Sequence, residues 1–427
     1  MRQGSTAQDW KMISLDPTGQ VVASMNPKDK VTLCHPSIAV YPKGRIVVSF
    51  EETGPGVKHL SGKKGKSGGK VTQTQIVTSD DDGATWHPRA EAPFGRGRMM
   101  RDGAALVLIG HTGNLQLIES RSNGETWEKP SEITGSNSSE NKFNNGPANV
   151  WHEEGRLLTA FLEVTDPHCK GLKASVLSPV IAETAAGGSY SKTKDWTLSH
   201  AHKAFRDFFP HGSGAHLGIP YFDVPKADKG IDLGSGRWVN RIGWHALHVT
   251  KILDPNHLWH DPSGETYHLI GSTYSHRGNV ATVIQAKREG TRFQFSIPQS
   301  PSGSELGFIA LPGGHAGFDF MYDAPSKRYW VVSNPADDSM RKVSELKEAG
   351  LPCDPAPRLA LYHSKNLVDW ELAGVVAQGH RETSPAFAVK KDDLYIVTRS
   401  GVKDLKQPHR SLEVRLRKVP KFRELLG

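Results

Sequence analysis

Cysteine is scarce in this 427-residue sequence, which has 3 in all, Cys34, Cys169 and Cys353, without a Cys-x-x-C pair. Neither a zinc site nor a disulfide framework is therefore indicated. No apolar run approaches the roughly 20 residues that a membrane-spanning helix needs, so we expect no membrane partner. No positively charged start with an apolar core precedes Trp10. The location stays open, and a secreted or periplasmic one is favoured if a signal peptide was removed.

Turn residues are plentiful, with 43 Gly and 27 Pro, and they interrupt a recurring hairpin pattern. Residues 35–52 read as two short strands rich in Val, Ile and Phe, joined by a Pro-x-Gly turn at 42–44. Similar hairpins are predicted at 96–110, 147–165, 257–273, 317–334 and 384–400. In a closed repeat array each unit buries its faces on its neighbours. We therefore expect an all-β single domain over 1–427, with repeats over about 30–420.

A second motif indicates the architecture. Ser79 to Trp86 fits the pattern Ser-x-Asp-x-Gly-x-Thr-Trp, the Asp-box, and Ser120 to Trp127 fits it with Ser122 in place of the Asp. The motif is a turn in which the carboxylate accepts backbone hydrogen bonds and the Gly takes a positive φ, so we assign it no chemistry. With it, the chain resembles the sialidase-like β-propellers, whose Asp-boxes join the two outer strands of a blade.

The resemblance implies four-stranded antiparallel blades, and the sequence favours seven of them, with six as the alternative. The segment between Thr165 and Pro255 is longer than the outer half of one blade requires, and its strand-like piece at 244–252 fits a degenerate seventh blade. Residues 411–419 alternate apolar and charged side chains, which predicts an exposed outer strand. Segments 10–15 and 20–24 are expected to pair near it and close the ring.

In a propeller, the starts of the first strands and the ends of the second strands lie at the same face. Those positions are polar in this chain. They include His35, Arg98, Asn145, His257, Tyr274, Arg277, His315, Arg381 and Arg399, together with Glu51 and Glu52. A ring of His, Arg and Asn around a central channel suits a small-sugar site. Each residue taken alone could equally be a solvated loop residue.

The loop at 58–70 is cationic, and the whole chain carries a formal net charge of +8 with a pI near 9.2. Cationic clefts attract anionic ligands. The lysines are not interleaved with aromatic residues, so nucleic acid is not the expected partner. We expect a monomer that binds an anionic carbohydrate, and the alternative is a solvated loop without a ligand.

Comparison with the sialidases themselves shows two departures. Sialidases carry the Arg of a Phe-Arg-Ile-Pro motif at the first strand and an acid/base Asp in the loop that follows. The matching motif here is Leu33-Cys34-His35-Pro36, with Cys34 at the Arg position, and residues 53–78 contain no Asp or Glu. Sialidase activity would require a rearranged site. It remains an alternative, as does a propeller that binds glycan without catalysis.

The chain is more similar to the propeller enzymes that cleave rhamnosyl-glucuronate or ulvan-type linkages, and to α-L-rhamnosidase propellers. These rely on His, Tyr and Arg, and in one such group the catalytic His lies near the first strand, where this chain has His35. The resemblance implies a polysaccharide lyase or glycoside hydrolase acting on a uronate-containing glycan, such as one with rhamnosyl-glucuronate units.

Under this hypothesis His35 acts as base or acid, because an imidazole with a pKa near 6.5 exchanges a proton at neutral pH. Tyr274 would be the partner acid, and His260 completes the catalytic candidates. Arginines would neutralise the uronate carboxylate; the nominees are Arg241, Arg277 and Arg381.

The other substrate-binding candidates are Arg98, Asn145, His257, His315 and Arg399. No cofactor is required and no metal ligand is assigned. A structural Ca²⁺ among channel Asn and Asp oxygens is compatible with the sequence, although no ligand spacing demands it. Several histidines between 166 and 255, His245 among them, cannot be placed from the sequence.

Overall fold

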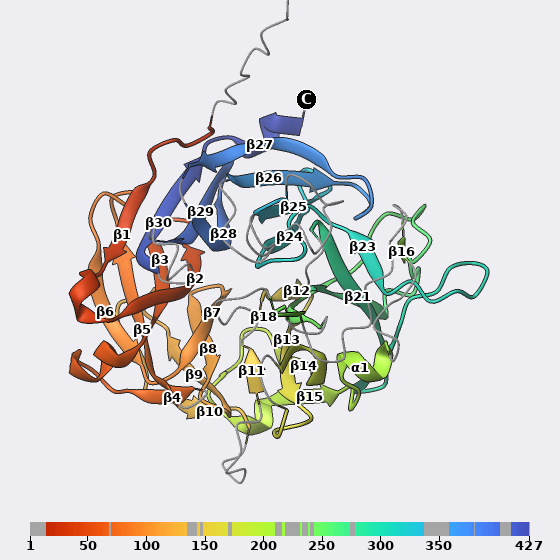
Figure 1. The fold of residues 1–427 in the computed structure, drawn as a ribbon, viewed down its shortest axis with the longest axis horizontal. Helices are drawn as coiled ribbons and strands as arrows, with labels where there is room; N and C mark the ends of the chain where they lie inside the picture. The colour runs from red at the N-terminus through yellow and green to blue at the C-terminus, as the bar shows by residue number, and fades with distance from the viewer. Residues whose placement is uncertain are drawn as a thin grey trace, which may run out of the picture.

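The computed structural model describes residues 14–67, 70–134, 143–145, 148–169, 173–209, 216–217, 231–232, 238–239, 243–273, 278–336, 358–379, 381–401 and 411–426. Over these ranges the strands form six antiparallel blades set around a common axis, so the chain is an all-β propeller (Figure 1). Six is the smaller of the two blade numbers that the sequence allowed. None of the helices in this part of the chain is long and apolar enough to span a membrane.

Blades 1 to 3 follow one another along the chain, each running from its innermost strand outward. Blade 1 contains β2 (Thr32–Val40), β3 (Ile46–Thr53), β5 (Lys70–Ser79) and β6 (His87–Ala92), with the short β4 (Gly65–Ser67) on β5. Blade 2 contains β7 (Gly95–Asp102), β8 (Ala105–His111), β9 (Leu115–Ser120) and β10 (Ser131–Glu132). In blade 3, β11 (Phe143–Asn145) and β12 (Trp151–Glu153) share the innermost place, followed by β13 (Arg156–Val164), β14 (Leu177–Ala185) and β15 (Trp196–His200).

Blades 4 to 6 complete the ring. Blade 4 contains β19 (His245–Thr250), β20 (Thr266–Ser272), β21 (Val280–Glu289) and β22 (Arg292–Ser296), with β23 (Phe308–Ala310) beside β21 and β16 (His216–Leu217) beside β23. Blade 5 contains β24 (Asp319–Asp323), β25 (Arg328–Ser333), β26 (Arg358–Ser364) and β27 (Glu371–Gln378). Blade 6 contains β28 (Glu382–Lys390), β29 (Asp393–Gly401), β30 (Ser411–Val419) and β1 (Gln20–Ser24).

Short elements lie outside the blades. The helix α1 is Phe205–Phe208, and β17 (Ile231–Asp232) pairs with β18 (Trp238–Val239). Single 3-10 turns occur at Pro27–Asp29, Pro55–His59, Lys173–Val176, Thr193–Asp195 and Phe422–Leu426.

One predicted hairpin is wrong. The inner hairpin of blade 4 is formed by β19 and β20, and residues 251–265 are the long loop between them. The sequence placed the first strand inside that loop, because Ser263-Gly264 reads as a turn. The segment at 244–252 that favoured a seventh blade is thus the missing strand β19. The other five hairpins are confirmed as β2/β3, β7/β8, β12/β13, β24/β25 and β28/β29.

The ring closes as predicted through the N-terminal strand. β1 pairs antiparallel with β30, from Gln20 opposite Leu416 to Ser24 opposite Glu413. Blade 6 therefore combines strands from both ends of the chain, and β1 and β30 cover each other's edge by hydrogen bonding.

The Asp-box joins β5 to β6, the outer strands of blade 1, as the resemblance implied. Asp81 accepts hydrogen bonds from Thr85 N (2.8 Å) and Thr85 Oγ1 (2.6 Å), and Ser79 Oγ accepts one from Gly83 N (2.8 Å). In the second copy the Ser122 hydroxyl accepts the bond from Thr126 N (2.8 Å). A hydroxyl therefore preserves the turn without the carboxylate.

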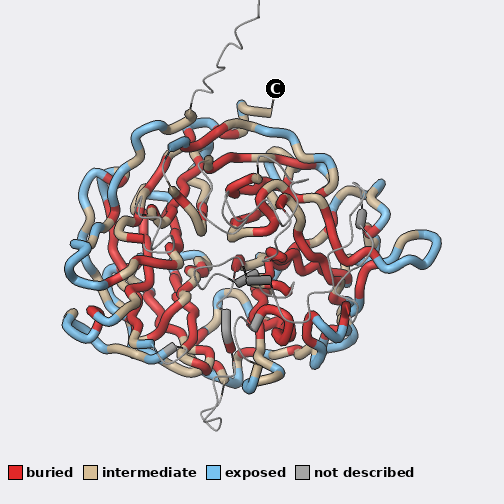
Figure 2. Tube along the Cα trace, viewed as in Figure 1, coloured by how far each residue is buried: buried red, intermediate tan, exposed pale blue. Residues whose placement is uncertain are grey.

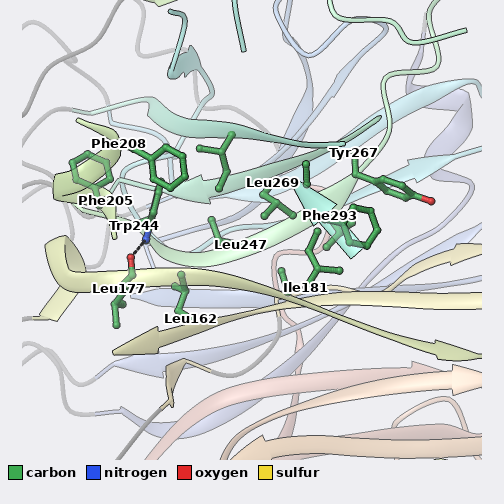
Figure 3. Close-up of a cluster of buried hydrophobic side chains, with 14 of the residues drawn as sticks. Leu162, Leu177, Ile181, Phe205, Phe208, Trp244, Leu247, Tyr267, Leu269 and Phe293 are labelled. Atoms are coloured by element: carbon green, nitrogen blue, oxygen red, sulfur yellow. Dashed lines mark hydrogen bonds between the residues drawn. The ribbon is translucent and has the colours of Figure 1, made fainter. Parts of the chain in front are cut away.

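The hydrophobic core lies between the blades. Each of the described apolar clusters fills the space between one blade and the next, and buried strands surround the axis while exposed loops form the rim (Figure 2). Between blades 3 and 4, Trp244 packs against Phe205 and Phe208 of α1, and its Nε1 donates to Leu177 O at 2.7 Å (Figure 3). Burial of such faces on their neighbours is what holds a repeat array together.

Four of the innermost strands contain a β-bulge near their first residues. β2, β7, β19 and β28 each gain one residue relative to the strand beside them. The bulge residue has left-handed backbone in every case, with φ of 45° at His35, 53° at Arg96, 71° at Ala246 and 51° at Ser384. β11 shows a register shift at its corresponding end. Because a bulge redirects a side chain, these residues leave the regular alternation of the strand.

Candidate functional site

The starts of the innermost strands and the ends of the second strands meet at one face of the ring, which we call the start face. Arg96 at the start of β7 reaches His245 at the start of β19, with 3.4 Å between its guanidinium and Nε2. At the opposite face, the turn face, Lys251 after β19 contacts Glu153 at the end of β12. Polar residues from blades 2 and 4 therefore meet at the start face.

His35 and Glu51 form a pair at the start face. His35 Nδ1 lies 2.7 Å from Glu51 Oε2, and the side chains are 34% and 7% exposed. Glu51 also accepts hydrogen bonds from Thr72 Oγ1 (2.7 Å) and Arg96 N (3.1 Å). Burial by itself would raise the pKa of Glu51, but the His35 bond and charge, the Thr72 bond and the Arg96 charge outweigh it and lower the pKa to about 2. Glu51 is thus a carboxylate that holds the imidazole.

Two arginines and a second histidine surround this pair. Loss of solvent lowers the pKa of His35 below its usual value, the Glu51 bond opposes that effect, and the charges of Arg96 and Arg399 add to it. Burial, with Arg96, His35 and Arg399 nearby, lowers the pKa of His245 to about 3. Both rings are therefore neutral near pH 7. We call His35, Glu51, Arg96, His245 and Arg399 the start-face cluster; with two guanidinium groups and one carboxylate it carries a net positive charge.

Arg399 connects blade 6 to blade 1 at the start face. It lies on β29 of blade 6, where its Nε donates to Thr383 Oγ1 (3.1 Å), and its guanidinium reaches Cys34 Sγ on blade 1 at 3.6 Å. Cys34 is the residue at the position of the sialidase Arg. A guanidinium from blade 6 therefore lies beside Cys34 of blade 1.

Arg98, predicted to bind substrate, holds a buried carboxylate. Its guanidinium donates to both oxygens of Asp319 (3.1 and 2.8 Å), and Phe387 N donates to Asp319 as well (2.8 Å). His248 Nε2 lies 3.4 Å from the same carboxylate. These contacts join blades 2, 4, 5 and 6 around the axis. Arg98 is 16% exposed and Asp319 1% exposed, so the positive charge of Arg98 is balanced by the buried carboxylate of Asp319.

Two of the predicted residues lie at the wrong face. His257 and His260 belong to the β19–β20 loop at the turn face. His260 Nδ1 bonds Ile252 O at 2.8 Å, and His257 Nδ1 accepts from Trp259 N at 3.0 Å. They stabilise their own loop and do not join the start-face cluster, because the error in placing the blade 4 hairpin moved them to the wrong end of the strand.

The remaining candidates divide into two groups. His315 and Arg381 lie at the start face, in the β23–β24 loop and just before β28; His315 is buried, and its Nδ1 accepts from Asn279 N at 3.1 Å. The backbone of Asn145 pairs with the end of β13 at that face. Tyr274, Arg241 and Arg277 lie outside the described residues.

The structure adds residues that the sequence did not select. Glu51, Arg96 and His245 are part of the start-face cluster but were not among the chosen site residues. Glu51 and Arg96 were visible as polar ends of predicted strands. His245 gave no signal, because its strand β19 had been placed elsewhere.

The cationic loop begins directly after β3, and thus at the start face. Within it Lys64 Nζ donates to the carbonyls of Ser61 (2.9 Å) and Gly62 (2.7 Å) and also contacts Leu60 O. Its other lysines are exposed; they are Lys58, Lys63, Lys66 and Lys70. Among the described residues, no group of three or more His, Cys, Asp or Glu side chains is arranged to hold a metal ion.

Comparisons with known proteins bear on the fold. No protein-family model and no curated protein matches the chain. Among solved structures it is similar to the alpha-L-arabinanase of Penicillium chrysogenum complexed with arabinobiose, with a TM-score of 0.51 and 14% identity over 96% of this chain and 99% of that one. A Dyadobacter fermentans protein of unknown function gives 0.51 and 14% over 94% and 98%.

A sialidase of Trypanosoma rangeli in complex with sialic acid gives a TM-score of 0.49 and 11% identity, over 97% of this chain and 60% of the sialidase. The chain thus spans about three fifths of that protein. At 14% identity, the likeness to the arabinanase and to the Dyadobacter protein shows a shared fold and nothing about substrate.

Proposed function

We propose that this propeller is a carbohydrate-active enzyme that cleaves an acidic, uronate-containing glycan at the start face, with His35 as the proton-transfer group. The observation that carries the proposal is the His35–Glu51 pair between Arg96 and Arg399. Ionised Glu51 accepts from Nδ1–H, which leaves the lone pair of the His35 ring on Nε2. Such a neutral imidazole can accept a proton.

The arrangement fits β-elimination. Arg96 and Arg399 would neutralise the uronate carboxylate, which makes the C5 proton more acidic. His35 would remove that proton, the C5–H electron pair would form the C4–C5 double bond, and the C4–O bond would break. The leaving oxygen takes up a proton, for which Tyr274 remains the candidate. The exposed lysines of the cationic loop support an anionic ligand, because they add positive charge to the segment that leaves β3 at the start face.

Glycoside hydrolysis is the second candidate. One structural neighbour is an arabinanase, and Glu51 places a carboxylate at the start face. However, a glycosidase of the usual kind needs two carboxyl groups free to act on the substrate. Glu51 is bound by His35, Thr72 and Arg96, and Asp319 by Arg98. Elimination is therefore favoured over hydrolysis.

The test compares wild type with His35→Ala on rhamnosyl-glucuronate oligosaccharides and on a fluorogenic sialoside. Ultraviolet absorbance detects the unsaturated uronate of a lyase, and reducing ends without that absorbance indicate hydrolysis. We expect unsaturated product from wild type and a loss of about 10²- to 10⁴-fold in His35→Ala. The exposed His87 on β6 of the same blade provides the control, and His87→Ala should keep full activity. Undiminished cleavage by His35→Ala would refute the proposed role.

A further inference from the structure

The bulges of the innermost strands bring four different side chains to the start face: a serine, a histidine, an arginine and an alanine. The bulge residues of blades 6, 1, 2 and 4 are Ser384, His35, Arg96 and Ala246. All four are partly exposed, whereas the residue after each bulge is buried. The shared register means that the four side chains leave their strands at equivalent places around the axis.

Left-handed backbone at these positions is unfavourable for any residue with a Cβ. The other described non-Gly residues with positive φ lie in turns, loops or strand-flanking positions, whereas these four interrupt innermost strands. Glycine would relieve the strain at each place, yet none of the four is glycine. Strained residues of this kind are concentrated at functional sites, where the side chain has a use that offsets the strain.

Ser384 is the member whose side chain has no assigned role. Its neighbour Thr383 is held by Arg399, which also reaches Cys34 beside His35, so blade 6 and blade 1 meet at this point. Gly317 of the β23–β24 loop lies opposite: a Cβ there would come within 3.8 Å of the Ser384 hydroxyl. Within the described part of the chain this hydroxyl has no hydrogen-bond partner. It is a polar group at the start face that is available to a ligand.

We infer that Ser384 contacts the substrate, and that its hydroxyl hydrogen-bonds a sugar hydroxyl of the glycan held beside His35. The four bulge residues then form one wall: Ser384 binds a neutral hydroxyl, His35 and Arg96 face the reacting unit, and Ala246 leaves room. This inference rests on the proposed function and names the part of the site that recognises an uncharged sugar group.

The test uses two substitutions that both remove the hydroxyl but differ in their effect on the strained backbone. Ser384→Ala keeps the left-handed strain, and Ser384→Gly relieves it. Binding of a rhamnosyl-glucuronate disaccharide is measured by calorimetry, and thermal melting reports stability. We expect both variants to weaken binding about 2- to 10-fold, the range for one neutral hydrogen bond. Ser384→Gly alone should melt at a higher temperature, by about 1–2 °C.

The outcomes separate this inference from the proposed function. If wild type binds the disaccharide and either Ser384 variant binds it with the same affinity, the inference about Ser384 is overturned while the proposed function stands. Weaker binding in Ser384→Gly only would assign the effect to backbone mobility and would also overturn it. A wild type that does not bind the disaccharide overturns the inference together with the proposed function. The expected equal loss in both variants supports a direct hydroxyl contact.

Discussion

Replacing Glu51 by Gln tests whether a buried carboxylate orients His35. The substitution keeps the shape of the side chain and removes its charge. Glu51 accepts three hydrogen bonds in wild type, from His35, Thr72 and Arg96 N, and it is almost fully buried. A glutamine amide can donate to Nδ1 as well as accept from it, so the His35 ring can change to the tautomer whose Nε2 carries the proton. That tautomer cannot act as a base at Nε2.

The size of the stability effect follows from the pKa of Glu51. The fall from 4.5 to about 2 corresponds to at most roughly 3 kcal/mol of folding free energy, at about 1.4 kcal/mol per pKa unit, and the part that comes from the charge of His35 is absent at pH 7, where that ring is neutral. Because the pKa of the folded state lies below that of the unfolded state, this stabilisation is present above pH 4.5 and is lost as the pH falls towards 2. At pH 7, the free energy of unfolding of Glu51→Gln should therefore be lower than that of wild type by up to roughly 3 kcal/mol.

The neighbouring Glu52 supplies a matched control of opposite sign. It is equally buried, but its oxygen accepts only from the amides of Gln73 (2.5 Å) and Gln75 (3.3 Å), and burial raises its pKa. Its charged form is thus disfavoured in the folded protein. Glu52→Gln should leave stability at pH 7 unchanged or raise it, since Gln73 Oε1 is buried with no hydrogen-bond partner among the described residues and can accept from the new amide.

Urea unfolding at pH 7 and pH 4, together with product formation on the uronate oligosaccharide, checks this prediction. Glu51→Gln should lose about 10²- to 10⁴-fold in rate, the range for a positioned proton-transfer group. Glu52→Gln should retain activity. Equal stability and equal rate for Glu51→Gln and wild type would refute the view that Glu51 is an ionised support of His35.

Two further results are expected. Arg98→Met should lower the free energy of unfolding by about 3–5 kcal/mol in urea titrations, because it leaves the buried Asp319 carboxylate without its cation; a loss below about 1 kcal/mol would show that His248 and Phe387 N suffice. Burial lowers the pKa of His245 and His268 from 6.5 to about 3, with the charge of Arg96 adding to the effect at His245 and that of His257 at His268. Below pH 6.5 the unfolded state therefore binds more protons than the folded state, and the free energy of unfolding should fall as the pH drops. Melting temperatures that stay constant between pH 7 and 5 would contradict this.

The sequence supported local conclusions better than distant ones. Asp81, Gly83 and Thr85 form the Asp-box turn through contacts within a few residues, so the motif alone predicted its geometry. The hairpin of blade 4 was misplaced because its strands are separated by a long loop, and turn residues inside the loop gave a false signal. That error placed His257 and His260 at the wrong face and left His245 unassigned.

Periodicity and turn chemistry in the sequence by itself predicted a repeat of antiparallel hairpins, five of the six inner hairpins and the Asp-box turns, because these depend on neighbours along the chain. The resemblance carried by the Asp-box motif added the propeller arrangement, and with it the face where His35 lies. Only the tertiary structure decided that Arg399 of blade 6 reaches Cys34, that Arg96 of blade 2 meets His245, and that Arg98 forms an ion pair with Asp319. Such pairs arise from ring closure, which brings together residues that are 149 to 365 positions apart. No local pattern encodes which side chains then meet across the axis.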